Sequence, residues 1–468
     1  MKYRIPTATA MPKRAPGNRY GGFICLAVVL LANFACAEDW PTYMHDNHRS
    51  GVTGESLIIT ELENGLGWVY QSSFSPQIAF DEEEPWDSYV PIVPMGPMRE
   101  FDFALFVSVV GDSLYFGSSV TDSVHCLDTL SGVQKWFFTT DGPVRFPPSY
   151  DNGKLYFGSD DGCAYCLNAA DGSLIWKYHP AGNNRFIGHN GKLISERPIR
   201  TGTAVYDGKV YFAGSIAPWK NSYIYSLAAA GGSDSGTGLY AVSTSGYTHM
   251  GAILVSDTNI YLTQGRRYPR VYNRSNGGGD TNIGSTAGDG GCYALLTAAS
   301  GFAYGHGQDH GAGYELRGYG DSLGTYPGGR CMVVAADGVY VTTGTTLTKK
   351  HRTSGNTIWS VSCDCPYALI LAGSVLFAGG TNKVVAFATG DGGELWSGAV
   401  NGHARGLAAA QGRLYVSTDT GQIRMFGASY LAADFNKNGI VDLPDLAIFV
   451  QNYLDCTDPI GPGCETWP

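Results

Sequence analysis

Oxygen-bearing residues recur near the end of the chain with a spacing that suits a bound calcium ion. Calcium is a hard cation that takes six or more oxygens, and a twelve-residue loop supplies them from positions 1, 3, 5, 7, 9 and 12. Gly439 stands at position 6, where the loop must turn sharply. The alternative is an unoccupied turn rich in Asp and Asn. The predicted ligands are Asp434, Asn436, Asn438, the backbone carbonyl of Ile440, Asp442 and Asp445.

The residues after this loop predict a helix. Apolar side chains at Leu446, Ile448, Phe449 and Leu454 fit one helical segment. Loop and helix together have an EF-hand-like pattern, with an aspartate at position 12 and no entering helix. In this they resemble the dockerin type I repeat. The resemblance implies one calcium ion as cofactor and a cohesin module as an alternative partner, although full dockerins carry two such loops and this segment has one.

Cysteine pairs are the other groups whose spacing could support chemistry. Cys163 and Cys166 form a CxxC motif, but leucine follows it, so it is not a haem-attachment motif. The motif falls in a predicted strand, where residues three apart point to opposite faces, so we expect both thiols to pack inside the fold. Cys363 and Cys365 are separated by one residue, and their side chains would share one face of a strand.

A repeated unit of strands must position these groups. Each copy has an aromatic strand, a turn, an alternating strand, a second turn and a closing strand with an aromatic residue. Turns such as Asp161-Gly162 supply the positive φ that tight hairpins need. One such sheet cannot bury both faces alone, so the copies must stack around a centre. Clear copies lie at 113–138, 154–178, 374–398 and 413–429, and looser ones begin at Lys209, Asn259 and Gly338.

These repeats predict an all-β fold, a β-propeller of seven blades with eight as the alternative. The glycine-rich stretch 276–330 has room for an eighth unit. The last unit stops after three strands, while residues 65–73 form an orphan closing strand whose Trp68 is in register with Trp136 and Trp176. We expect these two pieces to pair and close the ring.

The repeats resemble the PQQ-like (pyrroloquinoline quinone) propeller family over roughly 65–430. The resemblance is carried by LYFGSDDGCAYCLNAADGSLIWKY and its copies, and the entry segment DWPTYMHDNHRSGVT at 39–53 is similar to the leader of that family. The family contains quinone-dependent dehydrogenases and also scaffolds without a cofactor, so the resemblance implies the fold rather than an activity. We expect His45, His48 and Arg49 in the leader to make capping contacts.

The enzyme alternative depends on a quinone site. Quinone-dependent dehydrogenases generally need an aromatic floor and a cap for the quinone, a calcium ion beside it and an aspartate base, and many use two adjacent cysteines as the cap. This chain has no adjacent cysteines and no recognisable acid–base set. We therefore expect neither PQQ nor catalysis.

The N-terminus and the overall charge indicate where the protein works. Basic residues precede an apolar run at 23–37 that ends in Ala35-Cys36-Ala37, a pattern typical of an export signal cleaved before Glu38. A lipidated Cys36 is the alternative. The net charge of -10 gives no basic footprint for nucleic acid, and no segment of the mature chain has the length and apolarity of a transmembrane helix. We expect an exported protein of the periplasm, cell surface or extracellular space.

Four segments follow from these patterns: a signal peptide at 1–37, a leader at 38–64, the propeller at 65–430 and a dockerin-like calcium-binding module at 431–468. They predict an exported, non-catalytic binding or assembly scaffold that presents loops to a protein or glycan partner. The alternatives are a quinone-dependent oxidoreductase and a dockerin-tagged component of an extracellular polysaccharide-degrading system.

Overall fold

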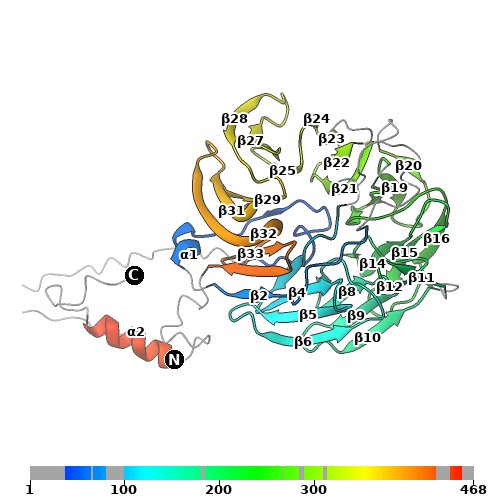
Figure 1. Cartoon of the computed structure of the whole chain (residues 1–468), viewed down its shortest axis with the longest axis horizontal. Coiled ribbons are helices and arrows are strands. Elements are labelled where there is room, and N and C mark those ends of the chain that lie inside the picture. The colour runs from blue at the N-terminus through cyan, green and yellow to red at the C-terminus, as the bar shows by residue number, and fades with distance from the viewer. Residues whose placement is uncertain are drawn as a thin grey trace, which may run out of the picture. The chain divides into compact units, whose positions relative to one another are not determined.

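Short antiparallel strands joined by tight turns make up nearly all of the regular structure (Figure 1). Alternating residues give each strand side chains on both faces, and both faces of most inner strands are buried. Burial on two faces is expected where sheets stack on one another rather than facing water. The computed structural model describes residues 37–64, 67–80, 100–180, 185–265, 267–283, 289–308, 314–427 and 443–455.

Six sheets of four antiparallel strands follow one another along the described chain. In chain order the first three are β3 (Val107–Val110), β4 (Ser113–Ser118), β5 (Ser123–Asp128) and β6 (Gln134–Thr139); β7 (Ser149–Asp151), β8 (Lys154–Gly158), β9 (Ala164–Asn168) and β10 (Leu174–Tyr178); and β13 (Ala204–Tyr206), β14 (Lys209–Gly214), β15 (Ser222–Ala228) and β16 (Tyr240–Thr244). The next three are β17 (Leu254–Val255), β18 (Asn259–Leu262), β19 (Arg270–Asn273) and β20 (Thr281–Asn282); β21 (Asp289–Leu296), β22 (Phe302–Gln308), β23 (Glu315–Tyr319) and β24 (Thr325–Pro327); and β25 (Cys331–Ala335), β26 (Gly338–Thr342), β27 (Thr346–Lys350) and β28 (Thr357–Ser362).

Two further groups of four strands share one long strand, β32 (Glu394–Ala410). The first part of β32 pairs with β31, and its last part pairs with β33. The first group is β29 (Ala368–Ala372), β30 (Val375–Gly379), β31 (Thr381–Ala388) and β32, and the second is β32, β33 (Arg413–Thr418), β34 (Gln422–Phe426) and β2 (Val69–Gln71). The described residues thus form eight four-stranded groups. The sheet β21–β24 lies within the glycine-rich stretch where the sequence left room for an eighth unit.

The first strands of the groups contact one another, and β21, β25 and β29, which Figure 1 labels, lie toward the centre of the arrangement. These first strands, called the inner strands, are β3, β7, β13, β17, β21, β25, β29 and the last part of β32. Contacts connect β3 to β7, β7 to β13, β13 to β17, β17 to β21, β25 to β29, β29 to β32, and β32 back to β3. The last group therefore packs against the first, as a closed β-propeller requires.

Closure of the last group is supplied by the early strand β2, as the sequence predicted. Val69 pairs with Arg424 and Gln71 with Gln422 in an antiparallel ladder. The indole of Trp68, just before β2, donates a hydrogen bond of 2.9 Å to the carbonyl of Thr129 in the first group. One piece of chain thus completes the last sheet and also contacts the first.

Five elements lie outside these groups. They are β1 (Val52–Thr53), the hairpin of β11 (Phe186–His189) and β12 (Lys192–Ser195), α1 (Ile59–Asn64) and α2 (Leu443–Asp455). The helix α2 covers the residues for which the sequence predicted a helix, and the loop predicted before it lies almost wholly outside the described residues. Neither helix in the described part of the chain has the length and apolarity needed to span a membrane.

Candidate functional site

The leader crosses the centre of the ring, where a propeller of this kind has its axial channel. Trp40 forms a two-way backbone bridge with Val109 of β3. Three more leader carbonyls accept backbone hydrogen bonds from inner strands of three further groups. The carbonyl of Pro41 accepts from Tyr150 of β7, that of Asn47 from Val255 of β17, and that of His48 from Leu296 of β21. Thr53 and Val52 of β1 then pair in parallel with β29. The leader is therefore hydrogen-bonded to five inner strands.

Arg49 fixes this leader through main-chain oxygens. Its side chain is 2% exposed, its Nε donates to the carbonyl of Ile253 and its Nη2 to that of Thr203, each at 3.0 Å. Its Nη1 donates to the carbonyls of Tyr43 and Asp46 at 3.0 Å. Burial lowers the pKa of Arg49 to about 10. The sequence prediction that this arginine makes capping contacts is confirmed.

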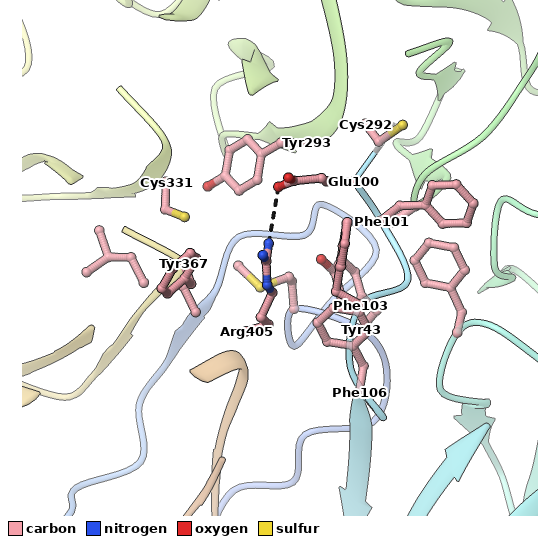
Figure 2. A pocket seen from close by; sticks show the side chains of 15 residues that line it. Tyr43, Glu100, Phe101, Phe103, Phe106, Cys292, Tyr293, Cys331, Tyr367 and Arg405 are labelled. Atoms are coloured by element: carbon pink, nitrogen blue, oxygen red, sulfur yellow. Dashed lines mark hydrogen bonds and ion pairs between the residues drawn. The ribbon is translucent and has the colours of Figure 1, made fainter. Parts of the chain in front are cut away.

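A small cavity lies on the axis directly against the leader (Figure 2). Its volume is about 60 Å³. The lining residues come from the leader, from residues 100–106 and from the inner strands or the residues just before them. They are Tyr43, Met44, Glu100, Phe101, Phe103, Phe106, Phe146, Ala252, Cys292, Tyr293, Cys331, Tyr367, Ala368, Leu369 and Arg405.

Aromatic rings fill most of the space around this cavity. Tyr43 meets Phe106 and Phe146 edge to face, with ring centroids 5.0 and 5.4 Å apart. Phe101 stacks on Phe146 at 5.8 Å. Rings packed in this way bury large apolar areas and hold each other in place. We call Tyr43, Phe101, Phe106 and Phe146 the aromatic plug.

One ion pair crosses the cavity. Arg405 of β32 lies 3.1 Å from the carboxylate of Glu100, and Figure 2 shows the two side chains pointing toward each other. The same guanidinium stacks over Phe103 at 4.3 Å and over Tyr367 at 4.8 Å. An arginine held between two rings and paired with a carboxylate is already neutralised, so it presents no free charge to a ligand.

Two titratable groups of the cavity have pKa values that are shifted toward the neutral form. Burial raises the pKa of Cys331 to about 12, and burial also raises the pKa of Tyr43. At neutral pH the cavity therefore offers a thiol and a phenol rather than a thiolate or a phenolate. Neither group is poised to act as a base or nucleophile there.

A buried charge cluster anchors the segments that enter the plug. Arg145 bridges Asp102 and Asp160, and Arg200 also pairs with Asp160 at 2.9 Å. Burial works to raise the pKa of Asp160, but the two guanidinium groups outweigh it and lower that pKa to about 2. Arg145 also donates to the carbonyl of Gln77. The cluster ties the strand ends of two groups to the residues on either side of 81–99.

A second, larger cavity is lined partly by other residues of the leader. Its volume is about 410 Å³, and its lining includes Glu38, Asp39, Asp46 and Asp151. Three of these carboxylates already accept hydrogen bonds within the protein: Asp39 from Gly111, Asp46 from Ser50, and Glu38 from the backbone of Gly54. The cavity is acidic, and its carboxylates hold the leader in shape.

Neither of these two cavities combines the size and the charge expected of a site for a quinone cofactor. Binding sites for molecules of that size enclose roughly 300 to 1,000 Å³, and the axial cavity is several times smaller. The larger cavity is lined by carboxylates, which repel an anionic cofactor such as pyrroloquinoline quinone. Where the chain is described, no group of three or more His, Cys, Asp or Glu side chains is arranged to hold a metal.

The predicted calcium site lies almost wholly outside the described residues. Asp434, Asn436, Asn438, Ile440 and Asp442 fall in that part of the chain, as does most of the signal peptide predicted at 1–37. Asp445 is described: it stands in the first turn of α2 and is 1% exposed. The metal assignment stays a prediction.

The CxxC cysteines pack as predicted. Cys163 belongs to a hydrophobic cluster with Val124 and Phe157, whereas Cys166 belongs to another with Tyr156 and Phe212. The two thiols are thus on opposite faces of one sheet, and both are at most 2% exposed. Burial raises the pKa of both thiols, to about 12 for Cys163 and about 11 for Cys166.

The plug was not found from the sequence. Glu100 and Arg405 are 305 positions apart, and Phe101 and Phe106 carry no recognisable motif. The leader is the signal in the sequence that could have indicated it. A segment that precedes the first blade and belongs to none of the repeats is expected to pack against the propeller.

Comparisons with known proteins agree with this architecture. Residues 100–215 and 343–434, together less than half of the chain, match the family model described as outer membrane protein assembly factor BamB. A tetrathionate hydrolase from Acidithiobacillus ferrooxidans is 27% identical over 111 residues, which are 24% of this chain. The match spans only 19% of the length of that relative.

Solved structures of similar fold include both enzymes and other proteins. A quinohemoprotein alcohol dehydrogenase from Comamonas testosteroni superimposes with a TM-score of 0.59 at 14% identity, covering 83% of this chain and 80% of that one. A europium-containing methanol dehydrogenase superimposes with a TM-score of 0.55 at 12% identity, covering 81% of this chain and 89% of that one. Saccharomyces cerevisiae Sqt1 superimposes with a TM-score of 0.50 at 12% identity, covering 68% of this chain and 93% of that one. Such low identities establish a shared fold alone. With the repeats, they support a β-propeller of PQQ-like repeats.

Proposed function

We propose that this chain is an exported, non-catalytic binding or assembly scaffold, and that its eight four-stranded groups are the eight blades of a closed propeller. The observation that carries the proposal is the plugged axis. The leader is bonded across the inner strands, and the aromatic plug leaves a cavity of about 60 Å³. Because the centre of the ring is filled by its own chain, we expect a partner to bind to the surface loops.

The binding partner would be a protein or a glycan, contacted by the turns that connect the blades. The match of two segments to the BamB family model, whose description names an assembly factor, supports this class of function. The net charge of -10 opposes binding to the phosphate backbone of nucleic acid. A dockerin-like C-terminal module with one calcium ion would tether or stiffen the end of the chain, and a cohesin remains the partner to test for it.

The second candidate function is that of a quinone-dependent oxidoreductase. It is favoured by the fold shared with two proteins that are named as alcohol or methanol dehydrogenases. The size of the axial cavity and the neutral thiol and phenol in it oppose this candidate. The tetrathionate hydrolase match covers too little of either chain to decide between them.

Titration with pyrroloquinoline quinone separates the two candidates. The purified chain from residue 38 onward would be titrated with the quinone and calcium by calorimetry, and dye-linked oxidation of alcohols and aldoses would be followed in parallel. We expect no saturable quinone binding and no turnover. Quinone-dependent turnover that saturates with substrate would overturn the scaffold proposal. Affinity capture from an exported fraction, with and without calcium, would then identify the partner.

A further inference from the structure

The axial cavity has an apolar, closed side and a polar side that solvent reaches (Figure 2). Its volume of about 60 Å³ has room for about four non-hydrogen atoms, because roughly 10 to 15 Å³ holds one water molecule. Phe101, Phe146 and Cys331 line the cavity and are buried. Arg405 and Glu100 also line it, and their side chains are 15% and 17% exposed. The ion pair therefore lies where a ligand can enter from solvent.

The guanidinium of Arg405 has more hydrogen-bond donors than its partner uses. Its Nη1 donates to the carboxylate of Glu100 at 3.1 Å, whereas its Nε is buried and donates to no residue in the described part of the chain. The rings of Phe103 and Tyr367, at 4.3 and 4.8 Å, hold the guanidinium plane in one orientation. A buried donor without a partner is costly, so an oxygen atom placed against this edge would be bound favourably.

Two more polar groups of the lining complete the hydrogen-bonding set. Tyr43 adds a phenolic O–H, and burial raises the pKa of Tyr43, so this group stays protonated and can donate. Glu100 supplies acceptor oxygens, since a carboxylate has about four acceptor positions and the printed bond to Arg405 uses one of them. The cavity thus offers donors and an acceptor beside walls of aromatic and aliphatic side chains.

Size and charge together restrict the chemical group that fits. Arg405 and Glu100 neutralise each other, so neither an anion nor a cation meets a net opposite charge in the cavity. The group should be neutral, contain about four non-hydrogen atoms, and carry one acceptor, one donor and one apolar end. An acetamido group, CH₃–CO–NH–, has these properties. Ligand sites with apolar walls and a few placed polar groups are the usual kind.

We propose that the axial cavity binds the acetamido group of an N-acetylated sugar. The carbonyl oxygen accepts from Arg405 and Tyr43, the N–H donates to Glu100, and the methyl group packs against the aromatic plug. The amide nitrogen carries the sugar ring, so the ring stays at the solvent-reached side, next to the surface loops. This inference rests on the proposed scaffold function and specifies its partner as a glycan.

N,N′-diacetylchitobiose is the probe for this site. The chain from residue 38 onward would be titrated with it by calorimetry, with cellobiose as the matched sugar that lacks acetamido groups. We expect saturable binding of the first sugar, with a dissociation constant on the order of millimolar for so small an anchoring group, and none of the second. In saturation-transfer NMR, the acetyl methyl protons should receive more magnetisation than the protons of the sugar rings.

Variants of two lining residues test the assigned contacts. Tyr43→Phe keeps the ring in the plug and removes one donor, so the affinity should fall severalfold. Arg405→Lys removes the planar donor edge and should weaken binding at least tenfold. Arg424→Lys is the matched control and should bind like the parent, because Arg424 stacks on Phe426 at 4.7 Å and does not line the cavity. Melting curves show which variants are folded, and Tyr43→Phe alone suffices if Arg405→Lys does not fold.

Three results would overturn the inference. The first is equal binding of cellobiose and N,N′-diacetylchitobiose, or binding of neither. The second is an unchanged affinity of the folded Tyr43→Phe protein. The third is binding of Nε-acetyl-lysine without binding of the N-acetylated sugar, which would assign the cavity to an acetylated peptide. None of these results bears on the scaffold proposal itself, which the quinone titration and the affinity capture test separately.

Discussion

Individual buried polar side chains decide which parts of this chain stay together. Arg49 is held by main-chain oxygens from the leader and from two groups of the ring. Without it the carbonyls of Ile253 and Tyr43 would lose the donor that Arg49 supplies, at a free-energy cost of about 1 to 3 kcal/mol apiece. The carbonyl of Thr203 would keep the hydroxyl of Ser149 as a donor. One arginine thereby makes the leader part of the core.

His249 should make the stability of the fold depend on pH. The side chain is fully buried, and burial, with a smaller contribution from Arg270, lowers its pKa to about 3. In the unfolded chain the pKa of histidine is about 6.5, so below that pH the unfolded state binds a proton that the folded state does not take up until about pH 3. Stability should therefore fall as the pH is lowered between these values, by about 2 kcal/mol from pH 7 to pH 5.

Urea unfolding at the two pH values measures this effect. His249→Gln should reduce the dependence, and the part that remains should come from His189, whose pKa burial lowers to about 4. His351→Gln, at an exposed position, should leave the dependence in place. If the parent and the His249→Gln protein lose the same stability at the lower pH, another group is responsible.

The C-terminal loop should bind one calcium ion through its carboxylates. Replacing Asp434 and Asp445 together with alanine should abolish calcium binding measured by calorimetry, because two of three carboxylate ligands are lost. The affinity of the parent should be modest, on the order of micromolar to millimolar, as in extracellular modules. The melting transition of the propeller should not change. Replacing the exposed turn residue Asp391 is the control, and undiminished calcium uptake by the double variant would place the site elsewhere.

The sequence was most informative where one residue had a local reason to be where it is. The capping role of Arg49 and the opposite faces of Cys163 and Cys166 followed from position and strand periodicity. The pairing of Glu100 with Arg405 could not be predicted, because it joins residues from distant segments and neither belongs to a motif.

At the scale of elements, the same kind of contact joins several groups to the next. The indole of Trp136 donates to the carbonyl of Ala169 in the following group, and that of Trp176 does the same to Ala229, at 3.2 and 3.0 Å. Trp359 donates to Thr389, and in the group β13–β16 Tyr240 takes the place of tryptophan. In each case the ring lies against a glycine of the next group. The closing-strand tryptophans therefore pack between neighbouring groups, as the repeats predicted.

Gly172 and Gly153 allow that contact to be tested within one sheet. Both have positive φ, 72° and 77°, but a Cβ on Gly172 would lie 2.5 Å from the ring of Trp136, whereas a Cβ on Gly153 would meet nothing within 4 Å. Gly153→Ala should cost about 1 kcal/mol from backbone strain alone. Gly172→Ala should lower the free energy of unfolding by about 1 to 3 kcal/mol more than Gly153→Ala does, because the ring of Trp136 must move.

Urea denaturation of the two variants measures the difference. Equal losses of stability would mean that the tryptophan ring moves without cost in free energy and does not hold the groups together.

The group β21–β24 was harder to recognise from the sequence because its closing strand, β24, has tyrosine rather than tryptophan and its turns are rich in glycine. A repeat that is identified by the tryptophan of its closing strand is missed where another residue takes the place of that tryptophan.

At the scale of the whole molecule, the early part of the chain closes the ring twice. The leader bonds to inner strands around the axis, and β2 completes the sheet of the last group. Without them the edge of β34 would be left unpaired and the plug would lose Tyr43. Unpaired strand edges and an opened core are the usual routes to aggregation and unfolding of β proteins.

Removal of residues 38–73 should therefore destabilise the entire ring rather than one blade. We expect the melting temperature to fall by roughly 5 °C or more, since a loss of 1 kcal/mol lowers the midpoint by about 2 °C in larger domains. The synthetic peptide 38–73 added to the shortened protein should restore part of the loss, because the strand β34 and the inner strands are available to pair again. The same peptide with Arg49→Met and Trp68→Ala is the matched control and should restore less, since it lacks the arginine that fixes the leader and the indole bonded to Thr129. A shortened protein that melts like the parent, measured by circular dichroism, would mean that the ring closes without its early chain.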